Sequence, residues 1–229
     1  MKIKTAPFIR KVYRLDEHSL VDWSEYNPKA VQVLAACHAE MNADAFRLLN
    51  QAEQVMGSLL EDTEPVALRP GAFEAISREL GGFQDAVETK AEPQLEGLFN
   101  HLPTALRSVL DHHPHPIWMN KIGGVQEMPL ETLEEEGVRV RLLSLPPGRG
   151  VAEHTHESEE LTLVLQGGFN DGHADYFRGD VCHASPELTH NPRAHEDGPC
   201  ICLTVEMGRL KFTHPVIAMA NMMLGWDRS

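Results

Sequence analysis

The chain has 229 residues, 42% of them hydrophobic and 24% charged, which is enough to form an ordinary core without disulfide cross-links. Its formal net charge of −14 argues against binding to nucleic-acid phosphates and suits either a basic protein partner or simple solubility. No apolar stretch approaches the ~18 residues of a membrane span, and scattered basic residues interrupt positions 1–14, where a signal peptide would need an apolar region. The four cysteines form no CxxC pair. We therefore expect a cytoplasmic protein.

Helical signals dominate residues 16–110. Asn27 followed by Pro28 predicts a helix that begins with proline in its first turn. Apolar residues then recur at spacings of mostly three and four, with a break near residues 36–44. They are Val31, Leu34, Ala35, Ala45, Leu48, Leu49, Ala52, Val55 and Met56. Further helices are expected from Pro70 to Gly81 and from Pro103 to Asp111.

The pattern changes after Trp118. Residues 138–143 alternate between apolar and polar as a strand does, and turn signals follow about every 8–12 residues. Many short strands with evenly spaced turns predict a sandwich or small barrel. We thus expect an α+β chain with a helical domain at residues 1–100 and an all-β domain at residues 101–229. The boundary falls between residues 85 and 120, in or after an acidic segment.

Four potential metal ligands lie in the β half. His154 and His156 are two apart on a predicted strand, so their side chains share a face. Glu160 begins the next strand, and a later turn-and-strand unit delivers His190. Three imidazoles and one carboxylate form a site for a divalent transition metal, whose affinity should fall at acid pH because the ligands must lose their protons.

The spacing of these residues resembles the first motif of the cupin superfamily. Gly148, His154, His156, Glu160 and Gly167 occupy all five of its positions. The second motif is looser: residues 179–180 fit its Gly-Asp turn and His190 follows, but an arginine replaces the proline and the final asparagine is not in place. The resemblance implies a jelly-roll, or double-stranded β-helix, barrel.

Two cysteines lie near the end of the β half. Cys200 and Cys202 should share one strand face with Thr204, while the opposite face carries apolar residues. Buried hydrophobic thiols are the default for such residues, and a redox-sensing pair that faces the metal is the alternative. The run His112-His113-Pro114-His115 is expected to form an exposed turn before the barrel.

Residues 153–167, 178–180, His190, 200–203 and 210–212 together resemble the ChrR family, and residues 67–72 and 102–107 do so more weakly. Members of this family are zinc-binding bacterial anti-sigma factors with a helical domain and a cupin domain. The resemblance implies that the helical domain holds an extracytoplasmic-function sigma factor inactive. It also implies that the cupin domain takes part in the response to oxidants.

The chain departs from this family in its helical half. The family carries a second zinc there, on a His-x3-Cys-x2-Cys motif and an earlier histidine. His38 is in place, but Asn42 and Ala45 stand at the cysteine positions, and the early histidine aligns near Tyr13, five residues from His18. An amide and a methyl group cannot replace two thiolates, so we expect that zinc site to be lost.

Three functions remain open from the sequence. The first is an anti-sigma regulator whose cupin domain binds a metal, with zinc as first choice and iron, manganese or nickel as alternatives. The second is a cupin metalloenzyme, such as a dioxygenase or isomerase, because four protein ligands leave positions free on an octahedral metal. A small-molecule binding module without chemistry is a third reading. Catalytic residues are not identified, and a homodimer is expected by analogy with other cupins alone.

Overall fold

A computed structural model describes residues 28–43, 45–47, 50, 54, 57–58, 69–72, 75, 101–113 and 116–224. The expectations for residues 1–27, for the apolar positions 48, 49, 52, 55 and 56, and for the acidic segment 85–96 lie outside these residues. So does the predicted helix from residue 70, apart from residues 70–72 and 75.

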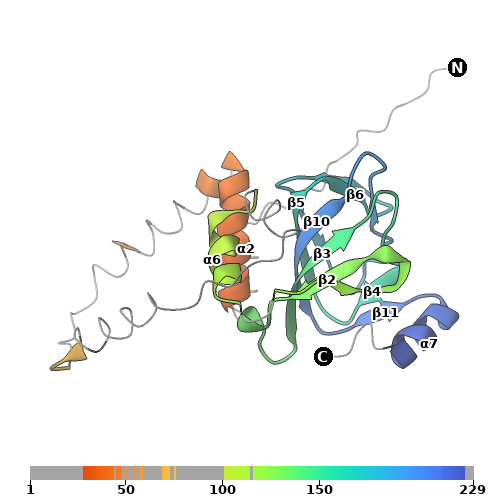
Figure 1. Ribbon diagram of the computed structural model, residues 1–229. Coiled ribbons are helices and arrows are strands. Elements are labelled where there is room, and N and C mark those ends of the chain that lie inside the picture. Colours follow the sequence, from red (N-terminus) through yellow and green to blue (C-terminus); the bar gives the residue numbers. More distant parts are fainter. Residues whose placement is uncertain are drawn as a thin grey trace, which may run out of the picture.

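Two helices represent the helical half in the described residues. Helix α2 (Pro28–Met41) begins at the proline as predicted, and α6 (Thr104–Asp111) follows Pro103. The two lie side by side against one face of the barrel (Figure 1). Glu40 holds them together, because its carboxylate accepts the backbone N–H groups of Thr104 at 2.8 Å and Ala105 at 3.2 Å. Those N–H groups begin α6 and have no partner within the helix.

Within its described residues, the β half contains eleven strands in three antiparallel sheets. The large sheet has the order β1-β2-β3-β10-β5-β8, the second pairs β11 with β4, and the third has the order β7-β6-β9. The strands are β1 (Met119–Asn120), β2 (Gln126–Pro129), β3 (Val138–Leu145), β4 (His154–His156), β5 (Glu160–Gln166), β6 (Gly168–Asn170), β7 (Asp175–Phe177), β8 (Val181–Ala184), β9 (Arg193–Ala194), β10 (Cys200–Met207) and β11 (Leu210–Phe212). Short 3-10 helices η2 (Ile122–Gly124) and η3 (Glu131–Leu133) lie between the first strands, and α7 (Pro215–Leu224) follows β11.

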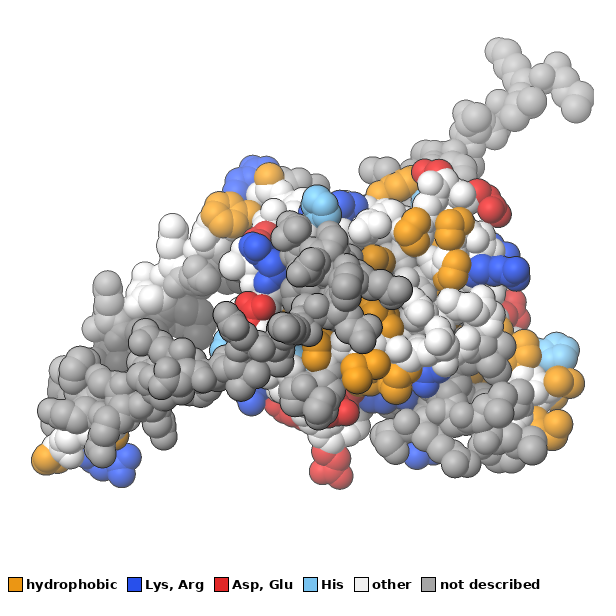
Figure 2. Space-filling model, in the orientation of Figure 1, with side chains coloured by type: hydrophobic (Ala, Val, Ile, Leu, Met, Phe, Trp, Pro, Cys, Tyr) orange, Lys and Arg blue, Asp and Glu red, His pale blue; other side chains and the backbone are white. Residues whose placement is uncertain are grey.

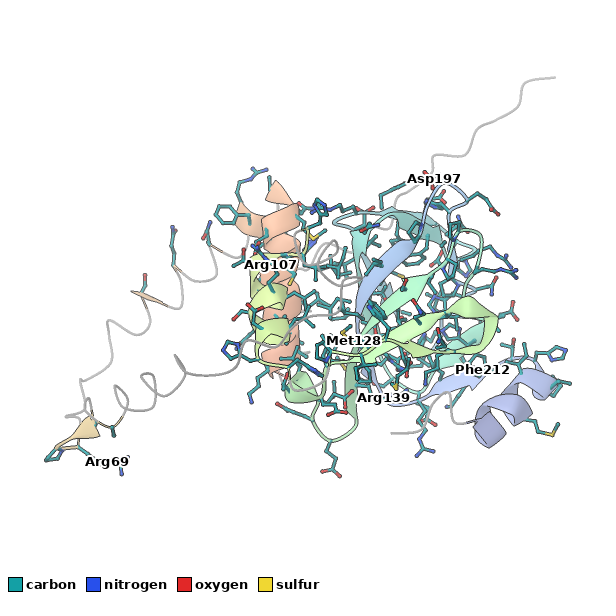
Figure 3. The ribbon with its side chains drawn as sticks, in the orientation of Figure 1. Arg69, Arg107, Met128, Arg139, Asp197 and Phe212 are labelled. Atoms are coloured by element: carbon teal, nitrogen blue, oxygen red, sulfur yellow. The ribbon has the colours of Figure 1, made fainter. Side chains whose placement is uncertain are left out.

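Hydrophobic side chains form two cores on opposite faces of the large sheet. The outer core joins α2 and α6 to the sheet and includes Leu34, Leu106 and the fully buried Met128 of β2 (Figure 3). The inner core lies inside the barrel and includes Phe169 and Tyr176, whose rings stack at 4.9 Å. Because α2 and α6 both contribute side chains to the outer core, the helices and the large sheet share one hydrophobic core. The division into domains at residue 100 stays a prediction.

The described surface also carries exposed hydrophobic side chains. Figure 2 shows several over the barrel and a further group over α7, where Val216 is 61% and Met219 is 55% exposed. Within the described residues, no helix has the length and hydropathy that crossing a bilayer requires. The expected exposed turn at residues 112–115 was wrong for His113, which is buried just after α6, where its N–H donates to the Leu110 carbonyl. His112 is exposed, and residues 114–115 lie outside the described residues.

Candidate metal centre

Three of the four predicted ligands converge at one point inside the barrel. Strand β4 projects His154 and His156 to the same side, and an isolated antiparallel bridge between His154 and His190 brings the third ring alongside. The Nε2 atom of His190 lies 3.0 Å from Nε2 of His154 and 3.0 Å from Nε2 of His156. All three side chains are buried, so these nitrogen atoms face each other and not solvent. The three histidines can therefore hold a metal ion.

The protonation of these rings suits metal binding. Burial lowers the pKa of His154. Burial of His156 and the nearby His154 ring lower the pKa of His156 to about 4. Burial and both other rings place the pKa of His190 well below its ordinary value. Neutral imidazoles therefore prevail at neutral pH, which is the form that binds metals.

The tautomer of His154 supports the same conclusion. Its Nδ1 lies 2.7 Å from the carbonyl oxygen of Ala152, which can only accept a hydrogen bond. Nδ1 must therefore carry the proton, and Nε2 presents a lone pair to the other two rings. Three ring nitrogens that meet at this distance need a proton or a cation between them, so the donor set fits a metal ion.

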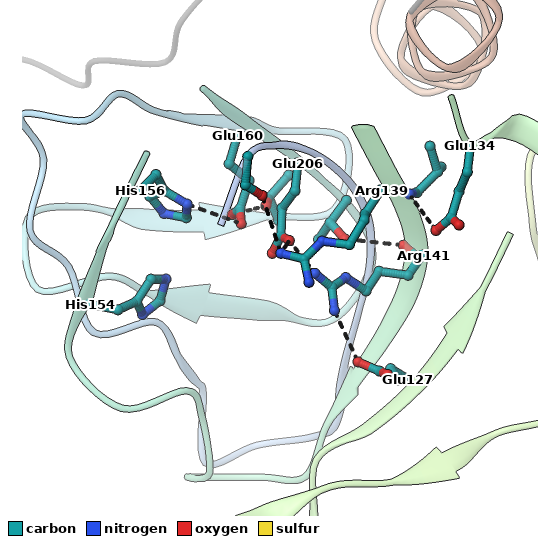
Figure 4. Close-up of polar contacts among 12 residues, drawn as sticks. Glu127, Glu134, Arg139, Arg141, His154, His156, Glu160 and Glu206 are labelled. Carbon is teal, nitrogen blue, oxygen red and sulfur yellow. Dashed lines mark hydrogen bonds and ion pairs between the residues drawn. The ribbon is translucent and has the colours of Figure 1, made fainter. Parts of the chain in front are cut away.

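Glu160, the fourth predicted ligand, takes a different position. Its Oε2 lies 3.8 Å from Nδ1 of His156, on the outer side of that ring, and its Oε1 accepts a 2.8 Å hydrogen bond from Thr162. The carboxyl group also meets that of Glu206 (Figure 4). Burial and the nearby Glu206 carboxylate raise the pKa of Glu160 above its usual range. Glu160 thus lies next to the three histidines without joining the point where their Nε2 atoms meet.

A buried network of charges, which the sequence did not reveal, holds this part of the barrel. Glu206 lies between two cross-strand partners, Arg139 on β3 and Glu160 on β5. It forms an ion pair with Arg139 at 2.8 Å and another with Arg141, which also bonds Glu127 at 3.1 Å (Figure 4). Burial opposes ionisation of Glu206, but Arg141 and Arg139 outweigh it and lower its pKa. The sequence indicated this network only through Arg139 and Arg141, which lie at alternate positions of the mostly apolar strand β3.

The cysteines lie where the alternation predicted. Cys200 and Cys202 belong to the inner core, whereas Ile201 and Leu203 belong to the outer one. The two Sγ atoms are 3.5 Å apart, and Cys202 lines the cavity beside the histidines. The hydrogen bond between Cys202 and Cys200, together with burial, raises the pKa of Cys202 well above its ordinary value, which leaves little reactive thiolate. The redox role of this pair stays a prediction.

The cavity beside the histidines is small. Its volume is about 40 Å³, and its lining includes Arg141, His154, Thr162 and His190 together with apolar side chains of the inner core. Pockets for organic ligands usually measure ~300–1,000 Å³. A few water molecules or a ligand of similar size fit here, but a larger substrate does not.

Comparison with known proteins reveals the same two-part organisation. Residues 108–209 match the family model described as the ChrR cupin-like domain. The anti-sigma-E factor ChrR of Cereibacter sphaeroides is 32% identical over 187 residues, which cover 80% of this chain and 84% of the relative. This chain belongs to the ChrR family. The expected cupin barrel after a helical N-terminal region is thereby confirmed.

Solved structures extend the comparison. The crystal structure of Rhodobacter sphaeroides SigE in complex with the anti-sigma ChrR matches with a TM-score of 0.60 and 27% identity, covering 84% of this chain and 97% of that chain. An acetylacetone dioxygenase from Acinetobacter johnsonii matches at 12% identity and a TM-score of 0.39, covering 47% of this chain and 85% of that chain. The similarity to the dioxygenase is too weak to support any conclusion about the activity of this chain.

Proposed function

We propose that this ChrR-family chain is an anti-sigma factor that binds an extracytoplasmic-function sigma factor and keeps it from RNA polymerase. The observation that carries the proposal is the extent of the similarity to ChrR. The 187 aligned residues far exceed the 108–209 range of the cupin model, so the similarity includes the helical half as well as the barrel. A shared barrel alone would leave the function open. A protein that inhibits a sigma factor would act in the cytoplasm, where the sigma factor meets RNA polymerase.

The helices are the part that we assign to the sigma factor. Phe46, which follows α2, exposes 54% of its surface although it is a large aromatic residue. Aromatic side chains of this kind are frequent anchors of protein interfaces. The net charge of −14 complements a basic partner and would accelerate its association.

The cupin half is the part that we assign to the metal. We propose that His154, His156 and His190 bind one divalent ion, with zinc as first choice because neutral imidazole is a ligand that it prefers. Glu160 would complete the set as a fourth ligand if its side chain turned toward the Nε2 atoms, since its Oε2 now lies 3.8 Å from the outer Nδ1 atom of His156. Bound metal would polarise its ligands and any small molecule in the cavity. This chain's own residues supply the neutral rings and the closed, mainly apolar surroundings.

The alternative of a cupin enzyme has less support. A cavity of about 40 Å³ leaves no space for an organic substrate next to the histidines. Oxygen consumption by the iron-loaded protein in the presence of a small substrate would support the enzyme alternative.

The experiment that tests the proposal measures sigma-factor binding and transcription. The metal-loaded chain is mixed with each extracytoplasmic-function sigma factor of its own bacterium, and binding is followed by calorimetry and by transcription in vitro. We expect one of them to form an equimolar complex and to lose promoter activity. If every sigma factor stays unbound and active, the proposal is wrong.

A matched pair of variants locates the binding surface. Phe46→Asp places a charge on the helical half, and Phe177→Asp places the same charge on β7, where the phenylalanine is 46% exposed. We expect Phe46→Asp to weaken the complex at least about tenfold, as for an aromatic anchor, and Phe177→Asp to leave it unchanged. The reverse pattern would move the binding surface to the barrel. Light scattering of the free chain tests the predicted homodimer in the same series.

A further inference from the structure

The three histidines differ in how their outer ring nitrogens, the Nδ1 atoms, are held. Nδ1 of His154 donates to the Ala152 carbonyl, and Nδ1 of His156 faces Glu160. Nδ1 of His190 is buried and has no hydrogen-bond partner among the described residues. A buried imidazole N–H without an acceptor is costly, and metal-bound histidines nearly always donate that proton to a carboxylate, a carbonyl or a water molecule.

Asp171 is the carboxylate next to His190. A ring nitrogen of His190, a carboxylate oxygen of Asp171 and Sγ of Cys182 all lie within 4.8 Å of one another, and all three side chains are buried. Oδ1 of Asp171 accepts the backbone N–H groups of His173 at 2.8 Å and Ala174 at 2.7 Å. Its Oδ2 lies 4.0 Å from the Cys182 thiol and retains capacity to accept another bond.

Backbone hydrogen bonds fix the two segments against each other. The N–H group of Asn191, directly after His190, donates to the carbonyl of Asp171 at 3.0 Å. A ring nitrogen of His173 lies 2.8 Å from the carbonyl of Thr189, just before His190. The bond between Asn191 and Asp171 continues the pairing of β6 with β9, and the His173 ring adds a side-chain contact, so the position of Asp171 beside His190 is fixed next to the sheet.

The charge of Asp171 points to the same function. Its side chain is 1% exposed, yet no lysine or arginine in the described part of the chain forms an ion pair with it. Buried carboxylates normally face a cation or several hydrogen-bond donors. Backbone N–H groups already satisfy Oδ1 of Asp171, and the Tyr176 hydroxyl also interacts with the carboxylate. A histidine bound to a divalent ion carries part of the ion's charge and would add a charged donor through its Nδ1–H group.

We propose that Asp171 is a positioning residue of the metal centre and accepts the Nδ1–H proton of metal-bound His190, directly or through one water molecule. The inference rests on the proposed metal site. A small movement of the ring closes the gap, and the cavity, which Cys182 and His190 both line, also has space for a bridging water. The contact fixes the tautomer in which Nε2 of His190 has its lone pair directed at the metal.

The same three residues could instead bind a second ion, since nitrogen, sulfur and carboxylate ligands suit zinc. The shared His190 ring speaks against that arrangement, because it would place two divalent charges on opposite sides of one imidazole inside an apolar barrel. The two possibilities differ in metal stoichiometry, so one experiment separates them.

The test compares three variants of the full chain: Asp171→Asn, Asp175→Asn and Cys182→Ala. Asp171→Asn keeps the Oδ1 acceptor that caps the turn and changes only the other oxygen. Asp175→Asn makes the same chemical change at an exposed position of the same hairpin. Cys182→Ala removes the thiol and keeps the carboxylate. Zinc affinity is measured by chelator competition, stoichiometry by elemental analysis, and the stability of the metal-free chain by thermal unfolding.

We expect Asp171→Asn to weaken zinc binding about 10–100-fold, the usual effect of losing such a partner, while the metal-free chain unfolds near the wild-type temperature. Asp175→Asn and Cys182→Ala should bind zinc as the wild type does. In nitrogen-15 spectra, the zinc-loaded wild type should show His190 with its proton on Nδ1, and Asp171→Asn should lose that slowly exchanging proton.

Three results would overturn the inference. Unchanged zinc affinity in Asp171→Asn would show that the carboxylate does not act on His190. A lower unfolding temperature of the metal-free variant with unchanged affinity would show that Asp171 only supports its turn. Two zinc ions per wild-type chain, reduced to one by Cys182→Ala, would indicate the second metal site. A wild-type chain that binds no metal at all would instead refute the proposed metal centre.

Discussion

The two halves of the molecule each bury a histidine where a ChrR-family zinc site is expected, but they use it differently. In the helical half, Nδ1 of His38 lies 2.9 Å from the carbonyl oxygen of Gly179, at the turn that leads into β8. In the barrel, the Nε2 atoms of His154, His156 and His190 face one another. Burial lowers the pKa of His38 just as it lowers the pKa of the barrel histidines. Both halves thus contain a buried neutral imidazole. What distinguishes a metal site is that the nitrogen atoms of several such rings converge.

One of the two positions where the family motif led us to expect cysteines caps a helix in the helical half. Asn42 ends α2, and its side-chain oxygen accepts the backbone N–H of Ala45 at 3.3 Å. This is the hydrogen bond of a helix N-cap, which starts the helical segment that follows. His38 and Asn42 therefore form a contact with the barrel and a helix cap, respectively. The earlier histidine position, near Tyr13 and His18, lies outside the described residues.

Removal of the barrel histidines should have the largest effect. His154→Ala combined with His156→Ala should reduce bound zinc from about one ion per chain to about none, because two of three converging nitrogen donors are lost. The helical signal in circular dichroism should persist. His183→Ala combined with His195→Ala is the matched control, since these rings contact Glu159 and Asp175 outside the cluster. Full zinc occupancy in the first variant would contradict the ligand assignment.

Arg141→Met tests the buried charge network inside the barrel. The change removes the cation that Glu127 and Glu206 share and leaves each with one partner, Lys121 and Arg139, respectively. The free energy of unfolding should therefore fall by about 1–3 kcal/mol. Lys211→Met is the control, because its pair with Glu157 is largely exposed and should contribute less than about 1 kcal/mol. Urea unfolding measures both. A loss below about 1 kcal/mol for Arg141→Met would mean that the carboxyl groups find other partners.

His38→Leu tests the junction between the halves. Loss of the bond to Gly179 leaves a buried carbonyl unsatisfied and should cost about 1–3 kcal/mol at pH 8. The pKa of His38 is lowered from 6.5 by burial, so below that pH the unfolded chain takes up a proton that the folded chain does not. Wild-type stability should therefore decrease on acidification below about pH 7.

The difference between wild type and His38→Leu should accordingly become smaller as the pH falls. The measurement is urea unfolding from pH 8 to pH 5 with a chelator present, so that the barrel histidines contribute equally to both proteins. A difference that grows on acidification would show that His38 is charged in the folded chain.

Asn42→Ala should have the smallest effect. Loss of the cap should lower the free energy of unfolding by about 1 kcal/mol, and Asn42→Asp, which keeps an acceptor oxygen, should restore most of it. Zinc content should be the same in all three proteins. A fall in zinc content with Asn42→Ala would mean that the helical half still binds metal.

Local spacing was sufficient to predict the features that lie within one strand. His154 and His156 point the same way because they are two apart, and the faces of β10 separate as the alternation required. Contacts between distant segments could not be predicted in this way. Arg139 meets Glu206 through the register of β3 with β10, and His38 meets Gly179 across 141 positions of the chain. Both depend on how strands and helices pack, which no local pattern encodes.

The strand that carries two of the histidines has a consequence for the order in which the site forms. Strand β4 pairs with β11, where Phe212 lies opposite His154 and Leu210 opposite His156, and its other neighbour in the described chain is the bridge to His190. Ribosomes release a chain from its N-terminus, so β11 emerges after β4 and after His190. Until then β4 has only the bridge to His190 as a described partner. A chain that stops before residue 210 would therefore contain all three histidines and lack the strand that pairs with two of them.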